Sequence, residues 1–191
     1  MTDSSRRPET MEEKDVIDLL LAQHAMIRDM FDDVERAAPD QRGPAFTRLV
    51  RMLAVHETAE EEIVHPYVRK VVDGGDAVVD DRLAEEREAK ELLQRLEEEG
   101  PDAPDFLERL ALLRAAVTAH AQSEERHEFV RLRAETGPAE RRAMAAGVKA
   151  AEALAPTHPH PGVESATMNL LVGTPIAMVD RIRDVIRQAM R

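Results

Sequence analysis

Apolar residues recur every three or four positions through four long segments of this chain, which predicts four amphipathic helices. The segments are about 12–38, 45–72, 77–99 and 105–136, and none of them contains glycine. Stretches with Gly or Pro separate them, at 39–44, 73–76 and 100–104. Because short connections favour antiparallel neighbours, we expect an all-α, up-down-up-down four-helix bundle.

The residues beyond the fourth segment predict an extension with further helices. Segment 138–154 is rich in alanine and predicts a fifth helix, and 156–162 contains the Pro-rich sequence of an extended linker. A last stretch, 175–189, has isoleucines and valines at helical spacing. The expected organisation is a disordered N-terminus, the bundle and a C-terminal extension, at 1–11, 12–136 and 137–191.

The second and fourth segments carry the same short unit on their apolar stripes. The units are His56-x-x-x-Glu60 and His120-x-x-x-Glu124. A spacing of four places both side chains on one helix face, one turn apart, so each helix can offer an imidazole and a carboxylate to the same space. One such unit is common on a glutamate-rich helix, and it is the repetition that gives the pattern its meaning.

The stripes of the first and third segments are each interrupted by one polar residue, His24 and Glu86. Burying an ionised carboxylate is costly unless it is paired or bound to a metal. Imidazole and carboxylate ligands inside a helix bundle suit non-haem iron or manganese. The sequence therefore predicts a metal site formed by His24, His56, Glu60, Glu86, His120 and Glu124.

Two further histidines leave the ligand set open. On a straight α-helix, His65 points about 140° away from Glu60, because five residues advance about 500°. Pro66 removes a backbone donor and can bend or bulge the helix, which would swing His65 inward. His127 lies on the stripe of its helix but nearly two turns beyond His120, where a surface position or an outer contact is expected.

Composition and charge exclude several classes of protein. The chain has 38 Asp+Glu against 26 Lys+Arg and a net charge of −12, which argues against a nucleic-acid partner. It has no cysteine, which excludes disulfides, iron–sulfur clusters and thiolate zinc sites. No segment approaches the roughly 20 apolar residues of a membrane span, and no secretory signal is visible, so we expect no membrane partner and a cytoplasmic protein. Other glutamates, including Glu57, Glu85 and Glu125, are interpreted as solvated charges.

The spacing of His24 and the two repeated units resembles that of the hemerythrin-like, or HHE cation-binding, proteins. Residues 15–24 (DVIDLLLAQH) and 56–66 (HETAEEEIVHP) are similar to the first-helix and second-helix motifs of that family. The tail from about 156 to 180 resembles an actinobacterial branch. The resemblance covers nearly the whole chain from about residue 13.

The resemblance implies an oxo- or hydroxo-bridged centre of two iron ions between four helices, with manganese as the alternative occupant. Glu60 and Glu124 would be the bridging carboxylates. His24 and His56 would bind one iron, and His120 and a third-helix ligand would bind the other.

The third helix departs from the family pattern. Classical oxygen-carrying members have two histidines there, whereas residues 80–92 contain none, and Glu86 falls where a histidine is usual. Either Glu86 binds the second iron or it pairs with an arginine such as Arg82. An anionic ligand in place of a neutral imidazole favours the ferric state.

We therefore expect a non-haem di-iron protein whose partner is a small oxidant, dioxygen or hydrogen peroxide. Peroxide decomposition or redox sensing is favoured over oxygen carriage, and whether the protein is an enzyme stays open. The alternative is a non-catalytic helical interaction module with a structural or vestigial metal site. The sequence does not predict a protein partner, the oligomeric state or the role of the C-terminal extension.

Overall fold

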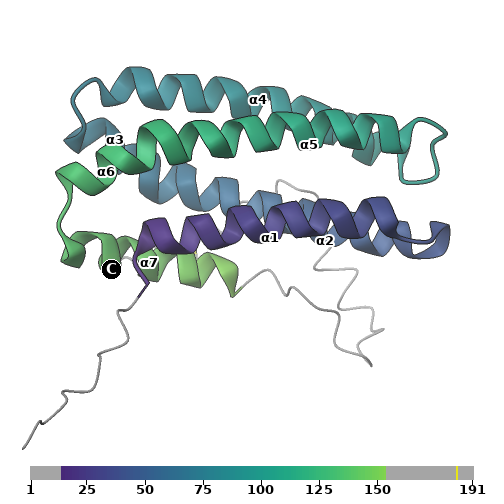
Figure 1. The fold of residues 1–191 in the computed structure, drawn as a ribbon, viewed down its shortest axis with the longest axis horizontal. Helices are drawn as coiled ribbons and strands as arrows, with labels where there is room; N and C mark the ends of the chain where they lie inside the picture. Colours follow the sequence, from purple (N-terminus) through teal and green to yellow (C-terminus); the bar gives the residue numbers. More distant parts are fainter. Residues whose placement is uncertain (1–13, 154–183, 185–191) are drawn as a thin grey trace, which may run out of the picture.

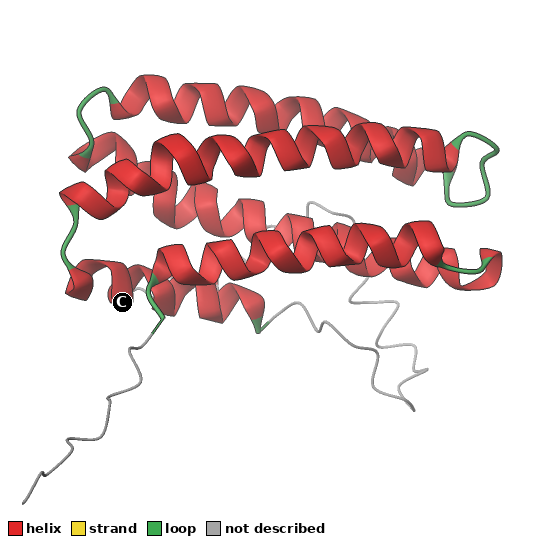
Figure 2. Ribbon diagram, viewed as in Figure 1, coloured by secondary structure: helices red, strands yellow, loops and turns green. Residues whose placement is uncertain are grey.

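The computed structural model describes residues 14–153 and residue 184, and all the regular structure in that part of the chain is helical (Figures 1 and 2). The elements are α1 (Val16–Arg36), α2 (Pro39–Ala59), η1 (Glu60–Val64), α3 (His65–Val71), α4 (Gly75–Glu99), α5 (Phe106–Ser123), η2 (Glu124–Glu128), α6 (Phe129–Glu135) and α7 (Pro138–Glu152). Here η1 and η2 are short π-helical turns.

These elements form four long antiparallel rods: α1; α2 with η1 and α3; α4; and α5 with η2 and α6 (Figure 1). The expected all-α, up-down-up-down four-helix bundle is thus confirmed, and α7 is an extra helix that packs against α1 and α2. Within the described residues no helix is both long and apolar enough to cross a membrane. The expectations for 1–11 and 156–162 lie outside the described residues, and of 175–189 the structure describes only Asp184.

The connection between the first two rods is shorter than expected. The stretch 39–44 was predicted to be a break, but α2 already begins at Pro39. A proline is well tolerated in the first turn of a helix, because the N–H that it lacks has no partner there in any case. The chain therefore reverses within Ala37 and Ala38, whose backbone is extended.

The start of α1 is fixed by a capping box. The carboxylate of Asp15 accepts hydrogen bonds from the backbone N–H groups of Ile17 and Asp18, and the Asp18 carboxylate accepts from the Asp15 N–H. Arg141 of α7 donates a further hydrogen bond to Asp15, 2.7 Å long. This contact ties the beginning of the bundle to the helix that follows it.

Two apolar clusters fill the bundle, and a polar layer separates them. One cluster contains Leu20, Val79 and Phe129, and the other contains Ile27 and Leu113. Between them along each rod lie buried ionisable side chains: His24, His56, Glu60, His65, Arg82, Glu86, His120, Glu124 and Glu128. Such a layer is costly in a plain core, because each ionised group loses its hydration.

The two π-helical turns begin at the glutamates of the repeated units. The N–H of His65 donates to the carbonyl oxygen of Glu60, and the N–H of Phe129 donates to that of Glu124, each five residues back. A π-turn inserts one extra residue, so a residue five positions on remains on the same face. The turns therefore bring His65 and Phe129 to the bundle interior, where both are buried.

Candidate metal centre

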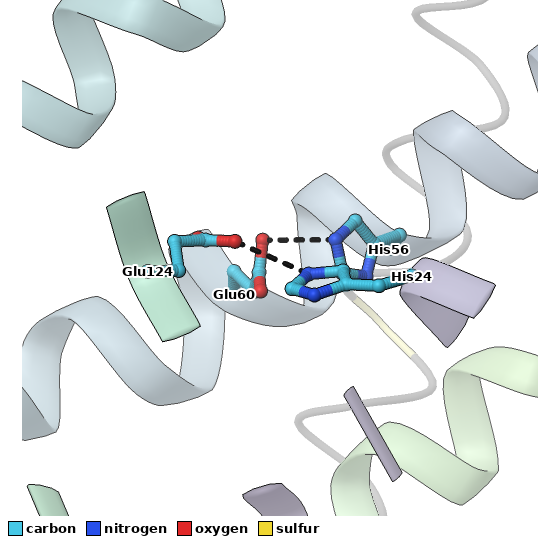
Figure 3. Close-up of side chains that lie close together, drawn as sticks. All are labelled: His24, His56, Glu60 and Glu124. Carbon is cyan, nitrogen blue, oxygen red and sulfur yellow. Dashed lines mark ion pairs between the residues drawn. The ribbon is translucent and has the colours of Figure 1, made fainter. Parts of the chain in front are cut away.

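Four buried side chains converge in the middle of the bundle: His24 from α1, His56 from α2, Glu60 from η1 and Glu124 from η2 (Figure 3). Their nearest ligand atoms all lie within 4.8 Å of one another. His24 Nε2 is 3.2 Å from a Glu124 oxygen, and His56 Nε2 is 3.4 Å from a Glu60 oxygen. Two imidazoles and two carboxylates thus surround one small space.

Glu124 also connects this group to His120. One carboxylate oxygen of Glu124 faces His24, and the other lies 3.2 Å from Nε2 of His120, one helical turn earlier. Glu124 therefore stands between two imidazoles from opposite sides. Five of the six residues predicted from the sequence are in this way brought together.

The sixth, Glu86, lies in a neighbouring cluster built around His65. Nε2 of His65 is 2.8 Å from a Glu86 oxygen, and Nδ1 of His65 is 3.2 Å from an oxygen of Glu128. Lys90, one turn along α4, is 3.3 Å from the other oxygen of Glu86. Arg82 pairs with Glu85, so the suggested pairing of Glu86 with Arg82 is not what the structure contains.

The three central histidines each have a partner for Nδ1. His24 is bonded to a Glu125 oxygen at 2.9 Å and His120 to a Glu85 oxygen at 3.0 Å. His56 is bonded to the Gln23 side-chain oxygen at 2.7 Å. Because each partner atom is an acceptor, Nδ1 carries a proton, and Nε2 is the nitrogen that each ring directs into the central space.

Several atoms facing that space are buried without a hydrogen-bond partner. They are Nε2 of His24 and of His120, both oxygens of Glu60 and both oxygens of Glu124. One oxygen of Glu128, in the cluster around His65, is buried without a partner in the same way. Leaving a buried polar atom unsatisfied costs about 1–3 kcal/mol, and more for a charged group. Nitrogen lone pairs and carboxylate oxygens that converge in this way fit a divalent or trivalent metal ion, which satisfies all of them at once.

In the metal-free cluster, the pKa values of Glu60 and His56 are both shifted so that the neutral form is favoured. Burial raises the pKa of Glu60 well above its usual range, and the carboxylates of Glu124, Glu128 and Glu86 raise it further. Burial lowers the pKa of His56 to about 3, with a contribution from His24. His56 is therefore a neutral imidazole at neutral pH, the form that binds a metal.

His65 behaves in the opposite way. Burial disfavours its charged form, but the hydrogen bonds with Glu128 and Glu86 outweigh this and raise its pKa to about 10. The pKa of Glu86 is lowered, since the contacts with His65 and Lys90 overcome the effect of burial. Glu86 is consequently held in its anionic form beside the central group.

A family model agrees with this geometry. The model of the hemerythrin HHE cation binding domain matches residues 15–132, which is more than half of the chain. The chain belongs to the hemerythrin HHE cation-binding family. Its match includes all six predicted ligands and both π-helical turns, and it ends before α7.

Two known proteins are similar to this HHE chain. A solved crystal structure, that of a hemerythrin HHE cation binding domain-containing protein from Mycobacterium kansasii, has the same fold, with a TM-score of 0.67 at 18% identity; the match covers 89% of this chain and 99% of that one. A protein from a Nostoc species, named a DNA nickase, is 27% identical over 123 residues. That match spans 64% of this chain but only 34% of the Nostoc protein.

The candidate metal centre of this HHE chain adjoins two cavities that differ in their lining residues and in their exposure to solvent. A small, partly open cavity of about 20 Å³ is large enough for a molecule the size of water. Three imidazoles and apolar side chains form much of its wall: His24, His56, His120, Ile27, Phe31, Leu53, Ala89, Val117 and Ala121. A second, solvent-open pocket between η1, α3 and α4 has His65 and Glu86 in its wall and Arg69, Arg87 and Lys90 among its other lining residues.

Sequence reasoning missed four residues of the site. Glu128 is buried beside His65, four residues after Glu124, whereas the predicted stripe continued through His127. Gln23, Glu85 and Glu125 were not singled out as partners of the histidines, yet each is adjacent in the sequence to a predicted ligand. Adjacency to a predicted ligand was the signal that could have indicated these three residues, but many surface glutamates share it. His127 is exposed, as expected for a surface position.

Proposed function

We propose that this chain is a non-haem di-iron protein that reacts with dioxygen or hydrogen peroxide, and that it decomposes peroxide or senses redox state rather than carrying oxygen. The observation that carries the proposal is the buried convergence of His24, His56, Glu60 and Glu124. The facing atoms of His24, Glu60 and Glu124 have no hydrogen-bond partner. The cation-binding family to which the chain belongs supports it.

In this proposal the two irons share the carboxylates of Glu60 and Glu124. His24 and His56 bind one iron, and His120 and Glu86 bind the other, with manganese as the alternative metal. Glu124 supports the arrangement because its two oxygens already face imidazoles on opposite sides. When bound, the irons would pass two electrons from one molecule of hydrogen peroxide, which becomes dioxygen, to a second one, which becomes water, so that no other reductant is needed.

The preference for peroxide chemistry rests on the proposed anionic ligand of the second iron. Glu86 is buried and stands where oxygen-carrying members of the family usually have a neutral imidazole. Anionic groups stabilise a ferric ion relative to a ferrous one, because the extra positive charge interacts favourably with them. A centre that prefers the ferric state is poorly suited to reversible dioxygen binding.

The small cavity beside the imidazoles is consistent with a small reactant. Its volume of about 20 Å³ has room for about one molecule of water size and is too small for an organic substrate. Ile27, Phe31 and Leu53 form an apolar part of its wall beside the three imidazoles, and Arg28, Glu57 and Thr118 also line it. The chain's own residues thus select the reactant by size and position it beside the proposed ligands.

Neither nucleic acid nor a membrane is part of the proposal, and the cytoplasmic location stays a prediction. The name of the Nostoc relative concerns DNA, but the matched region is about one third of that protein. A net charge of −12 makes association of this chain with phosphates unfavourable.

The test is to load the full chain with ferrous iron and follow the loss of excess hydrogen peroxide, with the chelator-treated chain as the control. The proposal expects many equivalents of peroxide to be consumed per chain by the iron-loaded form alone. Reversible uptake of dioxygen without peroxide loss would contradict the preference for peroxide chemistry. A chain that takes up no iron would favour the interaction-module alternative.

A further inference from the structure

Helix α7 lies outside the family match, yet it is connected by hydrogen bonds to a central histidine. The side-chain N–H of Gln23 donates to a carboxylate oxygen of Glu152, at the end of α7, over 3.1 Å. The side-chain oxygen of Gln23 is 2.7 Å from Nδ1 of His56. A continuous chain thus runs from α7 through α1 to α2, and its middle member, Gln23, is fully buried.

We propose that Glu152 is a positioning residue that fixes the metal-binding tautomer of His56 by orienting the amide of Gln23. The proposal rests on the proposed function in so far as His56 is taken to be a metal ligand. It assigns the extension beyond the family domain a role in the metal centre.

The orientation of the Gln23 amide follows from which groups can donate hydrogen bonds. An ionised carboxylate only accepts hydrogen bonds, so Glu152 requires the NH2 end of the Gln23 amide to face it. The carbonyl oxygen of the amide then faces His56 and accepts from Nδ1–H. A neutral imidazole carries one N–H, so this leaves the Nε2 lone pair free on the side of Glu60.

The other central histidines do not need such a third group. Nδ1 of His24 and Nδ1 of His120 are bonded directly to carboxylates, those of Glu125 and Glu85. A carboxylate fixes the tautomer by itself, whereas an amide can present either its oxygen or its NH2 group. His56 is therefore the one of the three whose tautomer depends on a residue two steps away.

The position of Glu152 is set by the packing of α7 on the bundle. Arg141 bonds to Asp15 at the start of the helix, and Glu140 accepts from the Tyr67 hydroxyl at 2.7 Å. The apolar face of α7 is buried in the core through Met144, Ala145, Val148 and Ala151. The carboxylate at the end of α7 is thereby brought to Gln23 by a rigid element.

The decisive variant is Glu152→Lys in the full-length chain, because lysine only donates hydrogen bonds. It should turn the Gln23 amide round, so that the NH2 group faces His56 and the imidazole proton moves to Nε2. We expect ferrous-iron affinity to fall about 10–100-fold, the range found when outer partners of metal-binding histidines are lost. Glu152→Ala leaves the Gln23 amide free to adopt either orientation, so its loss of iron affinity should be smaller than that of Glu152→Lys. Glu135→Lys, an exposed charge reversal at the end of α6, should match wild type.

A rescue separates orientation from simple packing damage. Combining Glu152→Lys with Gln23→Glu replaces the amide by a carboxylate that accepts from both the lysine and His56. The double variant should regain most of the lost iron affinity. A merely structural role for Glu152 predicts no such recovery, because a second buried substitution would only add to the damage.

Two measurements complete the test: iron affinity by competition with a chelator, and the tautomer of His56 by nitrogen NMR of the metal-free full chain. Nδ1–H in wild type and Nε2–H in Glu152→Lys are expected. Equal iron loss in Glu152→Ala and Glu152→Lys, absence of rescue, or an unchanged tautomer would each overturn the proposal. If wild type binds no iron, the proposed function fails, while the tautomer measurement still decides the role of Glu152.

Discussion

The backbone N–H of His65 donates to the carbonyl oxygen of Glu60, five residues earlier, and this π-type bond turns the imidazole of His65 into the bundle interior. There the ring lies between the carboxylates of Glu86 and Glu128, at 2.8 and 3.2 Å. A regular α-helix would have pointed His65 about 140° away from Glu60.

Replacing His65 should therefore be costly in the metal-free protein. His65→Ala leaves Glu86 and Glu128 buried without their shared partner, and loss of one member of a buried ion pair costs about 3–5 kcal/mol. Urea unfolding of the metal-free chain measures the change in the free energy of unfolding. His127→Ala, at an exposed position, is the matched control and should change it by less than about 0.5 kcal/mol. Equal stability of the two variants would contradict the buried pairing.

The inward turn at His65 was only partly predictable from the sequence. Pro66 signalled that the helix might bulge, because proline cannot donate the regular hydrogen bond. The equivalent π-turn at Glu124–Glu128 has no proline, and nothing in its local sequence announced it. Glu128 was missed for another reason: it lies four residues after Glu124, on the same face of a regular helix, but the predicted stripe was continued through His127 instead.

The bundle itself was predictable because its signal is spread over many residues. Apolar residues at steps of three and four, such as Leu20 and Ile27, mark the same face whether or not a helix boundary is misplaced. The hydrogen bonds to Nδ1 of His56 and His24 were not predictable, since they depend on side-chain geometry between helices. The contact of Glu152 with Gln23 is of this kind and joins residues 129 positions apart in the sequence.

Acid should weaken the contact between α7 and the start of α1. Burial opposes ionisation of Asp15, but the hydrogen bond from Arg141 and the bond from the Asp18 N–H outweigh it and lower the pKa below the usual 3.8. A lowered folded-state pKa gives stability that is present above pH 3.8 and is lost as the pH falls through the folded-state pKa.

Asp15→Asn keeps an acceptable helix cap but loses the charged partner of Arg141. It should cost about 1–2 kcal/mol at neutral pH, in line with a hydrogen bond between charged groups, and little in acid, where wild type has lost the same contribution. Thermal unfolding at several pH values measures this convergence. Asp29→Asn, at an exposed position, is the control; a constant difference between Asp15→Asn and wild type at every pH would refute the assignment.

Glu60→Gln should have opposite effects with and without metal. In the metal-free chain it removes a buried carboxylate that Glu124 and Glu128 destabilise, so the free energy of unfolding should rise by about 1–3 kcal/mol. In the iron-loaded chain the same change removes a proposed bridging ligand and should reduce the stabilisation that metal binding gives. Melting temperatures before and after chelation show both effects, with exposed Glu88→Gln as the control. A change of the same sign in both states would contradict the account.

Glu86 decides the character of the second position. Glu86→Ala should weaken iron binding there, whereas Glu86→His should retain both irons, raise the reduction potential and slow peroxide loss, because an anionic ligand no longer favours the ferric state. Iron titration, potentiometry and the rate of peroxide loss compare the two variants with wild type. Equal iron affinity and equal peroxide rates in all three would show that Glu86 acts only as the partner of His65 and Lys90.

The number of irons per chain tests the central claim most directly. Metal analysis of the full chain, supported by its absorption spectrum, is sensitive here because the protein has one tyrosine and no tryptophan to obscure charge-transfer bands. The account predicts about two irons per wild-type chain and the same for His127→Ala, as expected of a carboxylate-bridged pair in a bundle. In Glu124→Ala both irons should be lost, because the carboxylate between His24 and His120 is gone. A wild-type chain without iron, or a Glu124→Ala variant that keeps both, would contradict it.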